Sequence, residues 1–242
     1  MLIKTRAIVL RAFKFRDTKI IVDVFSEWQG RISLVCSLSL SGRGKFKKQL
    51  FQPLTLLAIE FDDKARGSLF SLHDVRVDIP YSSIPFNPYK STVALFIAEF
   101  LLYATRGEQE NPALYNYLRS SMSWLDLCPA SFANFHLVFT MRLSRFIGFF
   151  PNLDDYVPGS LFDLRESRFL FTIPLHSDYL SAEETSRITL LMRMNYENMH
   201  LFAMSRSERS RCLHLILLYY RLHTPGFPEL KSLSVLESLF DE

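Results

Sequence analysis

The stretch KTRAIVLRAFKFRDTKIIVDVF, residues 4–25, decides the fold of the N-terminal part of the chain. Residues 4–13 and 18–25 are rich in Ile, Val and Phe, which favour β-strands. The polar run at residues 14–18 separates them. We therefore expect two strands joined by a short polar loop.

Three further runs of the same character follow. Residues 32–36 come shortly after Gly30, and residues 53–61 and 69–77 are joined by a polar turn at residues 62–67. No helical pattern long enough for a crossover lies between the five runs, which argues against a βαβ layout. Five short strands in the first part of the chain therefore predict a small barrel.

The pattern changes after Pro80. The connector PYSSIPFNP, residues 80–88, holds three prolines, and the signals beyond it are helical. Helices are expected at residues 88–105, from residue 112, at 129–148, 182–204 and 207–223, and from residue 234. The predicted fold is α+β: a five-stranded OB-fold barrel over residues 1–80, then an all-helical domain over residues 81–242. A small β-hairpin insertion is expected near residues 160–173.

Charge is distributed unevenly along the chain. Residues 1–50 hold eleven Lys and Arg side chains against three acidic ones, whereas the whole chain has a net charge of only +3. A basic domain joined to a mildly acidic one is typical of a protein that binds a polyanion. The alternative is a solvated lysine surface without a ligand.

An OB-fold barrel binds nucleic acid on strands 2 and 3 and on the loops that join strands 1–2 and 4–5. Here the first loop is expected to carry Lys14 and Arg16, with Lys19 just after it, and the second Lys64 and Arg66. The segment SGRGKFKK, residues 41–48, adds four cations and an aromatic ring, which can contact phosphates and stack on a base. Trp28 is a second ring that could stack on a base. In the alternative interpretation, Phe46 anchors its loop to the barrel and Trp28 closes the barrel. The candidate DNA-binding residues are Arg6, Arg11, Lys14, Arg16, Lys19, Arg31, Arg43, Lys45, Phe46, Lys47, Lys48, Lys64 and Arg66.

Enzyme signatures are missing from the sequence. It contains no Gly-rich nucleotide-binding motif, no Gly-x-Ser-x-Gly and no His-Glu-x-x-His. The pairs at residues 73–74 and 176–178 are isolated, and the acidic doublets at residues 62–63 and 154–155 occupy predicted turns. A two-metal nuclease, the third hypothesis, needs several carboxylates that converge. We therefore expect no catalytic residue, no metal and no cofactor.

The cysteines and the apolar segments indicate in which cellular compartment the protein is expected. Cys36, Cys128 and Cys212 form no Cys-x-x-Cys pair, which argues against a disulfide framework and a cysteine zinc site. The cationic N-terminus lacks the apolar core of a signal peptide. The longest apolar run, residues 93–104, is interrupted by Glu99 and is too short to span a bilayer. We expect a cytoplasmic protein with no membrane association.

Four segments carry a resemblance to a known family. They are KTRAIVL at residues 4–10, the basic segment 41–48, the helix end and Gly-Phe-x-Pro turn at residues 142–153, and LKSLSVL at residues 230–236. Together, from one end of the chain to the other, they resemble the bacterial DNA repair proteins of the RecO family.

The resemblance implies a barrel of the oligonucleotide-binding type, a helical domain and recombination-mediator activity without catalysis. Members of the family bind single- and double-stranded DNA, anneal complementary strands and work with RecR at the nucleoid. They help to load RecA on DNA coated by single-stranded DNA-binding protein, whose acidic C-terminal tail they contact. A general nucleic-acid-binding module, for example for RNA, is the alternative function.

The tail requires a cation beside an apolar pocket. The predicted third helix offers arginines among aromatic side chains, although ordinary helix-surface charges would look the same. The candidate partner-binding residues are Arg142, Arg145, Phe146 and Phe149.

One departure from the family pattern concerns zinc. Many members carry a four-cysteine zinc site just after the Gly-Phe-x-Pro turn, but residues 153–160 contain no cysteine. Tyr156 stands at a position expected for one. The hairpin at residues 160–173 takes the corresponding place, and we expect apolar packing to hold it. The residues expected to pack are Leu161, Phe162, Phe169 and Phe171.

Overall fold

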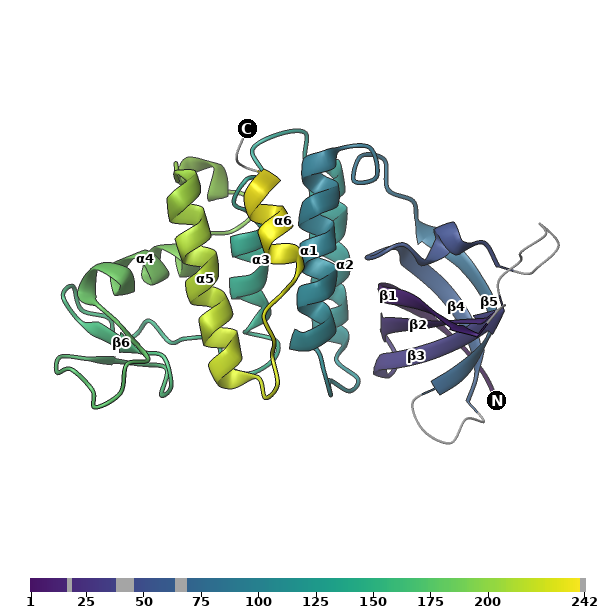
Figure 1. Cartoon of the computed structure of the whole chain (residues 1–242), viewed down its shortest axis with the longest axis horizontal. Coiled ribbons are helices and arrows are strands. Elements are labelled where there is room, and N and C mark those ends of the chain that lie inside the picture. Colours follow the sequence, from purple (N-terminus) through teal and green to yellow (C-terminus); the bar gives the residue numbers. More distant parts are fainter. Residues whose placement is uncertain (17–18, 38–45, 64–68, 240–242) are drawn as a thin grey trace. The chain divides into compact units, whose positions relative to one another are not determined.

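A computed structural model describes residues 1–16, 19–37, 46–63 and 69–239 (Figure 1). Its first five strands form a closed barrel in the order β1-β2-β3-β5-β4. The strands are β1 (Leu2–Arg16), β2 (Lys19–Ser26), β3 (Gly30–Ser37), β4 (Leu56–Asp62) and β5 (Leu69–Ile79). All neighbouring strands are antiparallel except β3 and β5, which are parallel. The predicted five-stranded barrel is confirmed.

Side-chain alternation builds the barrel core. In β3, Ile32, Leu34 and Cys36 point inward, and the residues between them are partly exposed. This period of two is the signature of a strand with one buried face. Strand β1 runs farther than expected, because Lys14 and Arg16 pair with residues of β2. The prediction that residues 14–16 lie in a loop is therefore wrong.

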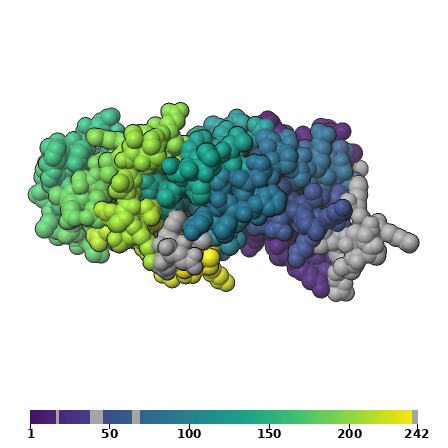
Figure 2. All heavy atoms as spheres, turned by 90° about the horizontal axis from the view of Figure 1, so that it is seen from above, coloured from purple at the N-terminus to yellow at the C-terminus, as the bar shows by residue number. Residues whose placement is uncertain are grey.

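The described residues divide into two compact units. The first unit combines the barrel with α1 (Pro88–Ala104), α2 (Pro112–Leu127), α6 (Ser232–Leu239) and the short 3₁₀ helix η1 (Lys48–Phe51). Figure 2 shows the yellow spheres of α6 beside the blue ones of α1, and Glu99 of α1 accepts hydrogen bonds from the N–H groups of Lys231 and Ser232. The first unit thus includes residues on both sides of residue 80. The domain boundary at residue 80 stays a prediction.

A buried carboxylate ties the proline-rich connector to the helices. Asp126 of α2 accepts hydrogen bonds of 2.8–2.9 Å from the backbone N–H groups of Ser82, Ser83 and Ile84, and one of 2.9 Å from the Ser82 hydroxyl. The buried Lys90 donates from Nζ to Ser83 Oγ at 2.7 Å and to the main-chain oxygen of Asp126 at 3.0 Å. The connector is therefore a structured part of the first unit.

The same network lowers the pKa of Asp126. Burial alone would raise this pKa, but the hydrogen bonds from Ser82, Ile84 and Ser83 outweigh it and bring the pKa from 3.8 to about 2. A carboxylate with a depressed pKa stabilises the fold above its unfolded pKa. That contribution is lost as the pH falls through the folded pKa.

We predict that Asp126→Asn lowers the free energy of unfolding by about 2 kcal/mol at neutral pH, because an amide NH₂ would face backbone donors. The difference from the wild type should narrow as the pH falls from 3.8 toward about 2. Urea denaturation over a pH series measures both effects. The exposed Asp155→Asn serves as the control. An Asp126→Asn deficit that does not change with pH would contradict the prediction.

The second unit comprises residues 128–229. Its helices are α3 (Phe135–Leu143), α4 (Ala182–Arg193) and α5 (Arg206–His223), with the 3₁₀ helix η2 (Met199–Leu201). Its small sheet has the order β7-β6-β8, from β6 (Leu161–Asp163), β7 (Arg168–Leu170) and β8 (Tyr179–Leu180). The predicted hairpin is confirmed, and β8 is an additional strand.

No helix in the described part of the chain is long and apolar enough to cross a membrane.

Two predicted helices of this unit are shorter than expected. The helix predicted at residues 129–148 begins only at Phe135, because Ser131 has a φ of +63°, which no α-helix accommodates. The helix predicted at residues 182–204 ends at Arg193. Beyond it, the Asn195 and Asn198 side chains each accept a 2.7 Å hydrogen bond from the other's backbone N–H. Such local bonds compete with helix continuation.

Aromatic packing stabilises the small sheet. The fully buried Phe162 ring lies 5.1 Å from the Phe169 ring and 6.3 Å from the Tyr219 ring. Tyr156 also packs on Phe169, at 5.4 Å. Phe171, expected in this cluster, is 73% exposed, so that expectation is wrong: the residue follows the end of β7 and points to solvent.

The residues present do not fit the family's four-cysteine zinc site. Cys36 lies in the barrel core, and only Cys128 and Cys212 belong to the second unit. Among the described residues, no group of three or more His, Cys, Asp and Glu side chains could hold a metal ion. A tetrahedral zinc site needs four such ligands.

We predict that Phe162→Ala lowers the free energy of unfolding by about 3 kcal/mol, because it leaves a cavity at a fully buried site. A zinc chelator should leave the melting temperature of the wild type unchanged. The matched control is Phe171→Ala, which removes an exposed ring and should cost less than about 0.5 kcal/mol. Thermal melts and elemental analysis measure these outcomes. About one zinc per chain, bound with the stabilising effect typical of structural sites, would refute the prediction.

Candidate nucleic-acid interface

Part of the outer barrel surface is covered by α1. Ala7 and Val9 belong to the barrel core, so Ile8 between them points outward, and its cross-strand partner is Phe25. Both Ile8 and Phe25 are nevertheless fully buried, because α1 packs on β1. Arg31, the neighbour of Phe25 on β3, donates from Nη1 to the main-chain oxygen of Leu102 in α1.

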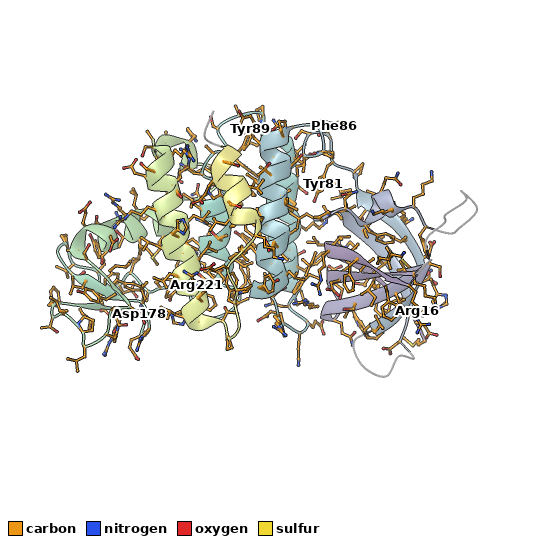
Figure 3. The ribbon with its side chains drawn as sticks, viewed as in Figure 1. Arg16, Tyr81, Phe86, Tyr89, Asp178 and Arg221 are labelled. Carbon is orange, nitrogen blue, oxygen red and sulfur yellow. The ribbon has the colours of Figure 1, made fainter. Side chains whose placement is uncertain are left out.

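Farther along β1, β2 and β3 the outer surface is open. Val22 and Leu34 belong to the barrel core, so the residues that alternate with them point outward. The strand register aligns these residues in three rows across the sheet. The rows, which we call the open face, are Arg11–Asp23–Ser33, Phe13–Ile21–Val35 and Arg16–Lys19–Ser37. Figure 3 shows Arg16 at the end of the barrel away from α1.

The first row is an ion-pair network. Asp23, 3% exposed, accepts hydrogen bonds from Arg11 Nε at 2.6 Å and from Ser33 Oγ at 2.5 Å. Arg31 Nη2 lies 3.9 Å from the same carboxylate. Burial lowers the pKa of the Arg31 guanidinium, although Asp23 acts in the opposite direction. Arg11 and Arg31 therefore neutralise a buried acid, which leaves them less positive charge for phosphate.

Arg6 forms an ion pair with a different acid, Glu27. It donates to both carboxylate oxygens of Glu27, at 2.8 and 2.5 Å, and this pairing raises the pKa of its guanidinium. The pair lies in a groove of about 440 Å³ on the barrel wall. The charged residues of this groove are Lys4, Arg6, Arg76, Glu27, Glu60 and Asp74. Three acids balance three cations, which makes the groove a poor site for a polyanion.

The other candidate cations occupy different surroundings. Lys14, Arg16 and Lys19 are exposed on the β1–β2 hairpin, and Lys47 and Lys48 are exposed at the start of η1. The remaining four cations, Arg43, Lys45, Lys64 and Arg66, lie outside the described residues.

The two candidate aromatic side chains have structural contacts. Phe46 is only 4% exposed and belongs to the barrel core, so it anchors its loop and is not available to stack on a base. This is the alternative that the sequence left open. Trp28 is 38% exposed, and its ring lies 6.2 Å from the ring of the buried Phe61.

The sequence analysis missed two aromatic residues of β1. Phe13 is 41% exposed and Phe15 is 48% exposed. The guanidinium carbon of Arg11 lies 4.9 Å from the centroid of the Phe13 ring, and that of Arg16 lies 5.5 Å from the Phe15 ring. The run Arg-Ala-Phe-Lys-Phe-Arg was the available signal, but its rings resembled ordinary strand residues.

The four candidate partner-binding residues have different surroundings. Arg142 Nε donates to the main-chain oxygen of Met194 at 3.0 Å. The Phe149 ring packs against Tyr219, Tyr220 and His223 at 4.9–5.6 Å. Arg145 is exposed, with its guanidinium 4.0 Å from the centroid of the Phe150 ring, and Phe146 is half-buried.

A second groove that the sequence did not reveal lies in the first unit. It has a volume of about 440 Å³ and is mostly apolar. Its apolar lining is Pro53, Tyr81, Ile84, Pro85, Ala94 and Leu95. Figure 3 shows Tyr81, Phe86 and Tyr89 near the start of α1.

Comparison with known proteins identifies the family. The family model for the N-terminal part of recombination protein O matches residues 1–79, and the model for its C-terminal part matches residues 85–234. The chain belongs to the RecO family. DNA repair protein RecO of Bacteroides fragilis is 52% identical over 242 residues, the full length of both chains. The RecO of Phocaeicola vulgatus is 49% identical and that of Flavobacterium psychrophilum 32%, each over 99% of this chain and the whole relative.

These findings confirm the resemblance seen in the sequence. The RecO models cover the barrel and most of the helical part, and the relatives align with the chain from end to end. Membership of the family assigns the chain a role in DNA repair and recombination. The open face is thus the outer surface of a RecO barrel.

Proposed function

We propose that this RecO protein is a DNA-binding mediator of recombinational repair that acts at the nucleoid without catalysis. It anneals complementary strands and, with RecR, helps RecA to load on DNA coated by single-stranded DNA-binding protein. The observation that carries the proposal is the cationic row of the open face, where Arg16 and Lys19 lie side by side on β1 and β2. Strands 2 and 3 are the nucleic-acid-binding surface of OB-fold barrels in general.

Charge explains how such a face promotes annealing. Two DNA strands repel one another through their phosphates, and each cation bound to a phosphate releases a condensed counterion. A strand bound along Arg16 and Lys19 carries less charge, so a complementary strand can approach it. Because the contacts are to phosphate, they are independent of sequence, as annealing of any complementary pair requires.

The alternative is a general OB-fold nucleic-acid-binding module, for example for RNA, without mediator activity. RNA recognition differs by contacts to the 2′-hydroxyl. Annealing of complementary DNA coated by single-stranded DNA-binding protein supports mediator activity. Binding to RNA in preference to DNA, without annealing, supports the alternative.

We predict that Arg16→Gln with Lys19→Gln weakens binding to single- and double-stranded DNA, because two phosphate contacts are lost. For single strands, the slope of log affinity against log salt should flatten by about 0.7 for each lost contact. A salt titration by fluorescence anisotropy measures the slope. The annealing rate should fall with the affinity.

The matched control for this test is Lys4→Gln with Arg76→Gln, which removes the same charge from the mixed-charge groove of the same barrel. This control should bind DNA with nearly wild-type affinity and salt slope. Equal losses in both double variants would mean that net charge, and not the open face, determines binding.

We further propose that the partner tail, an acidic peptide with an apolar end, binds beside Arg145, close to Phe146 and Phe150. Arg145 is exposed, whereas Arg142 and Phe149 already have structural contacts. A hydrogen bond between an arginine and a carboxylate is stronger than one between neutral groups, because the two partners carry opposite charges. The apolar groove that contains Leu95 is the competing site.

We predict that Arg145→Ala weakens binding of the tail peptide at least about 5-fold, as the loss of about 1 kcal/mol implies, and leaves the affinity for naked DNA unchanged. Leu95→Glu, at a 46% exposed position of the competing groove, should leave tail binding unchanged. Calorimetry measures both variants. If Leu95→Glu loses tail binding and Arg145→Ala keeps it, the tail binds in the apolar groove and not beside Arg145.

A further inference from the structure

Two exposed phenylalanines of β1 lie at the open face: Phe13 within its apolar row, and Phe15 beside its cationic row, in contact with Arg16. Phe13 occupies the apolar row with Ile21 and Val35, both only partly buried. Phe15 lies at the register shift between Lys14 and Arg16, where β1 has one residue more than β2. A β-bulge of this kind turns a side chain away from its regular direction, and Phe15 is 48% exposed.

Single exposed hydrophobic residues are common and need no function. This pair differs because each ring contacts the guanidinium of a neighbouring arginine. Arg11, fixed by its 2.6 Å hydrogen bond to Asp23, places its guanidinium over the Phe13 ring, and Arg16 places its own over the Phe15 ring. A ring held in one orientation loses less entropy when a ligand stacks on it.

The charges around the rings indicate a polyanionic ligand. Arg16 and Lys19 form the row next to Phe13, and Arg16 also contacts the Phe15 ring. Cations beside aromatic rings are the combination with which proteins hold single-stranded nucleic acid, phosphates on the cations and bases on the rings.

Access to the base faces distinguishes a single strand from a duplex. The faces of duplex bases are covered by their neighbours. Only a strand with separated bases can therefore offer one base face to each ring.

We infer that Phe13 and Phe15 stack on bases of one DNA strand and make the open face selective for single-stranded over duplex DNA. The inference rests on the proposed function, since it takes the open face as the DNA-binding site. It assigns the two tasks of the face to different residues. The cations provide affinity for any DNA, and the rings provide the preference for single strands.

The test uses Phe13→Ala with Phe15→Ala in the full chain. Affinity for a single-stranded oligonucleotide should fall at least about 5-fold for each ring that stacks. Affinity for a blunt duplex should change less than 2-fold, and the salt slope should stay the same, because no phosphate contact is lost. Replacing both residues by tryptophan should restore single-strand binding. The matched control is Phe86→Ala, which removes an 81% exposed ring from the connector (Figure 3).

A second measurement leaves the protein unchanged. An oligonucleotide of abasic sites keeps the phosphates but has no bases, so the wild type should bind it as weakly as the double alanine variant binds a normal strand. Wild-type affinity of the alanine variant for single strands, or equal wild-type affinity for the abasic and normal strands, would overturn the inference. A parallel loss for duplex would also overturn the selectivity.

These outcomes are distinct from a failure of the proposed function. If Arg16→Gln with Lys19→Gln weakens DNA binding and the alanine variant does not, the DNA site stands and the stacking role is wrong. If the wild type binds no DNA in any form, the proposed function itself fails. If the rings bind a partner protein instead, the alanine variant loses that protein and keeps the DNA, which also overturns the inference.

Discussion

The register between β1 and β2 is the constraint on which the candidate site depends. A shift by one residue would exchange the inward and outward side chains of β1. The core then would receive Arg11 and Phe13 in place of their neighbours, and the cationic row would no longer align with Lys19. The hydrogen bonds that join Arg11, Asp23 and Ser33 across three strands favour the observed register. The Asp23 carboxylate is buried, so it strongly disfavours any register that leaves it without a partner.

The same network determines where positive charge is available. Arg11 and Arg31 compensate Asp23, and Arg6 pairs with Glu27, so these three arginines contribute to the architecture of the barrel. The row of Arg16 and Lys19 lies beyond them, at the end of the sheet that α1 does not cover. The described cations of the N-terminal sequence thus include a paired group, Arg6, Arg11 and Arg31, and a row, Arg16 and Lys19, that forms no ion pair with another described residue. Arg16 and Lys19 can therefore exchange counterions for phosphates without breaking such a pair.

The small sheet of the second unit is stabilised by aromatic packing. Where the sequence resemblance implies a zinc site in many family members, the fully buried Phe162 packs here with Phe169 and Tyr219. The Tyr219 hydroxyl adds hydrogen bonds, to the Phe149 carbonyl at 2.7 Å and with Ser167 Oγ at 2.5 Å. Ser167 has a φ of +54°, a strained conformation at the tip of the β6–β7 hairpin. Aromatic packing and a few hydrogen bonds connect the hairpin to α5.

The sequence by itself determined the elements, because periodicity and caps are local. Five strand patterns and the helix starts predicted at residues 88 and 182 appear in the structure, where Asn87 and the Ser181–Glu184 capping box cap these helices. The sequence also showed where the cations are concentrated along the chain, and it carried the resemblance to the RecO family. Only the tertiary structure decided which of these residues face solvent, because that depends on contacts between residues far apart in the sequence. Phe46 is buried in the core and Phe13 is exposed, although both are phenylalanines directly followed by a lysine. The pairing of β1 with β2 turns Phe13 outward, and the closed barrel encloses Phe46. Neither can be read from a local pattern.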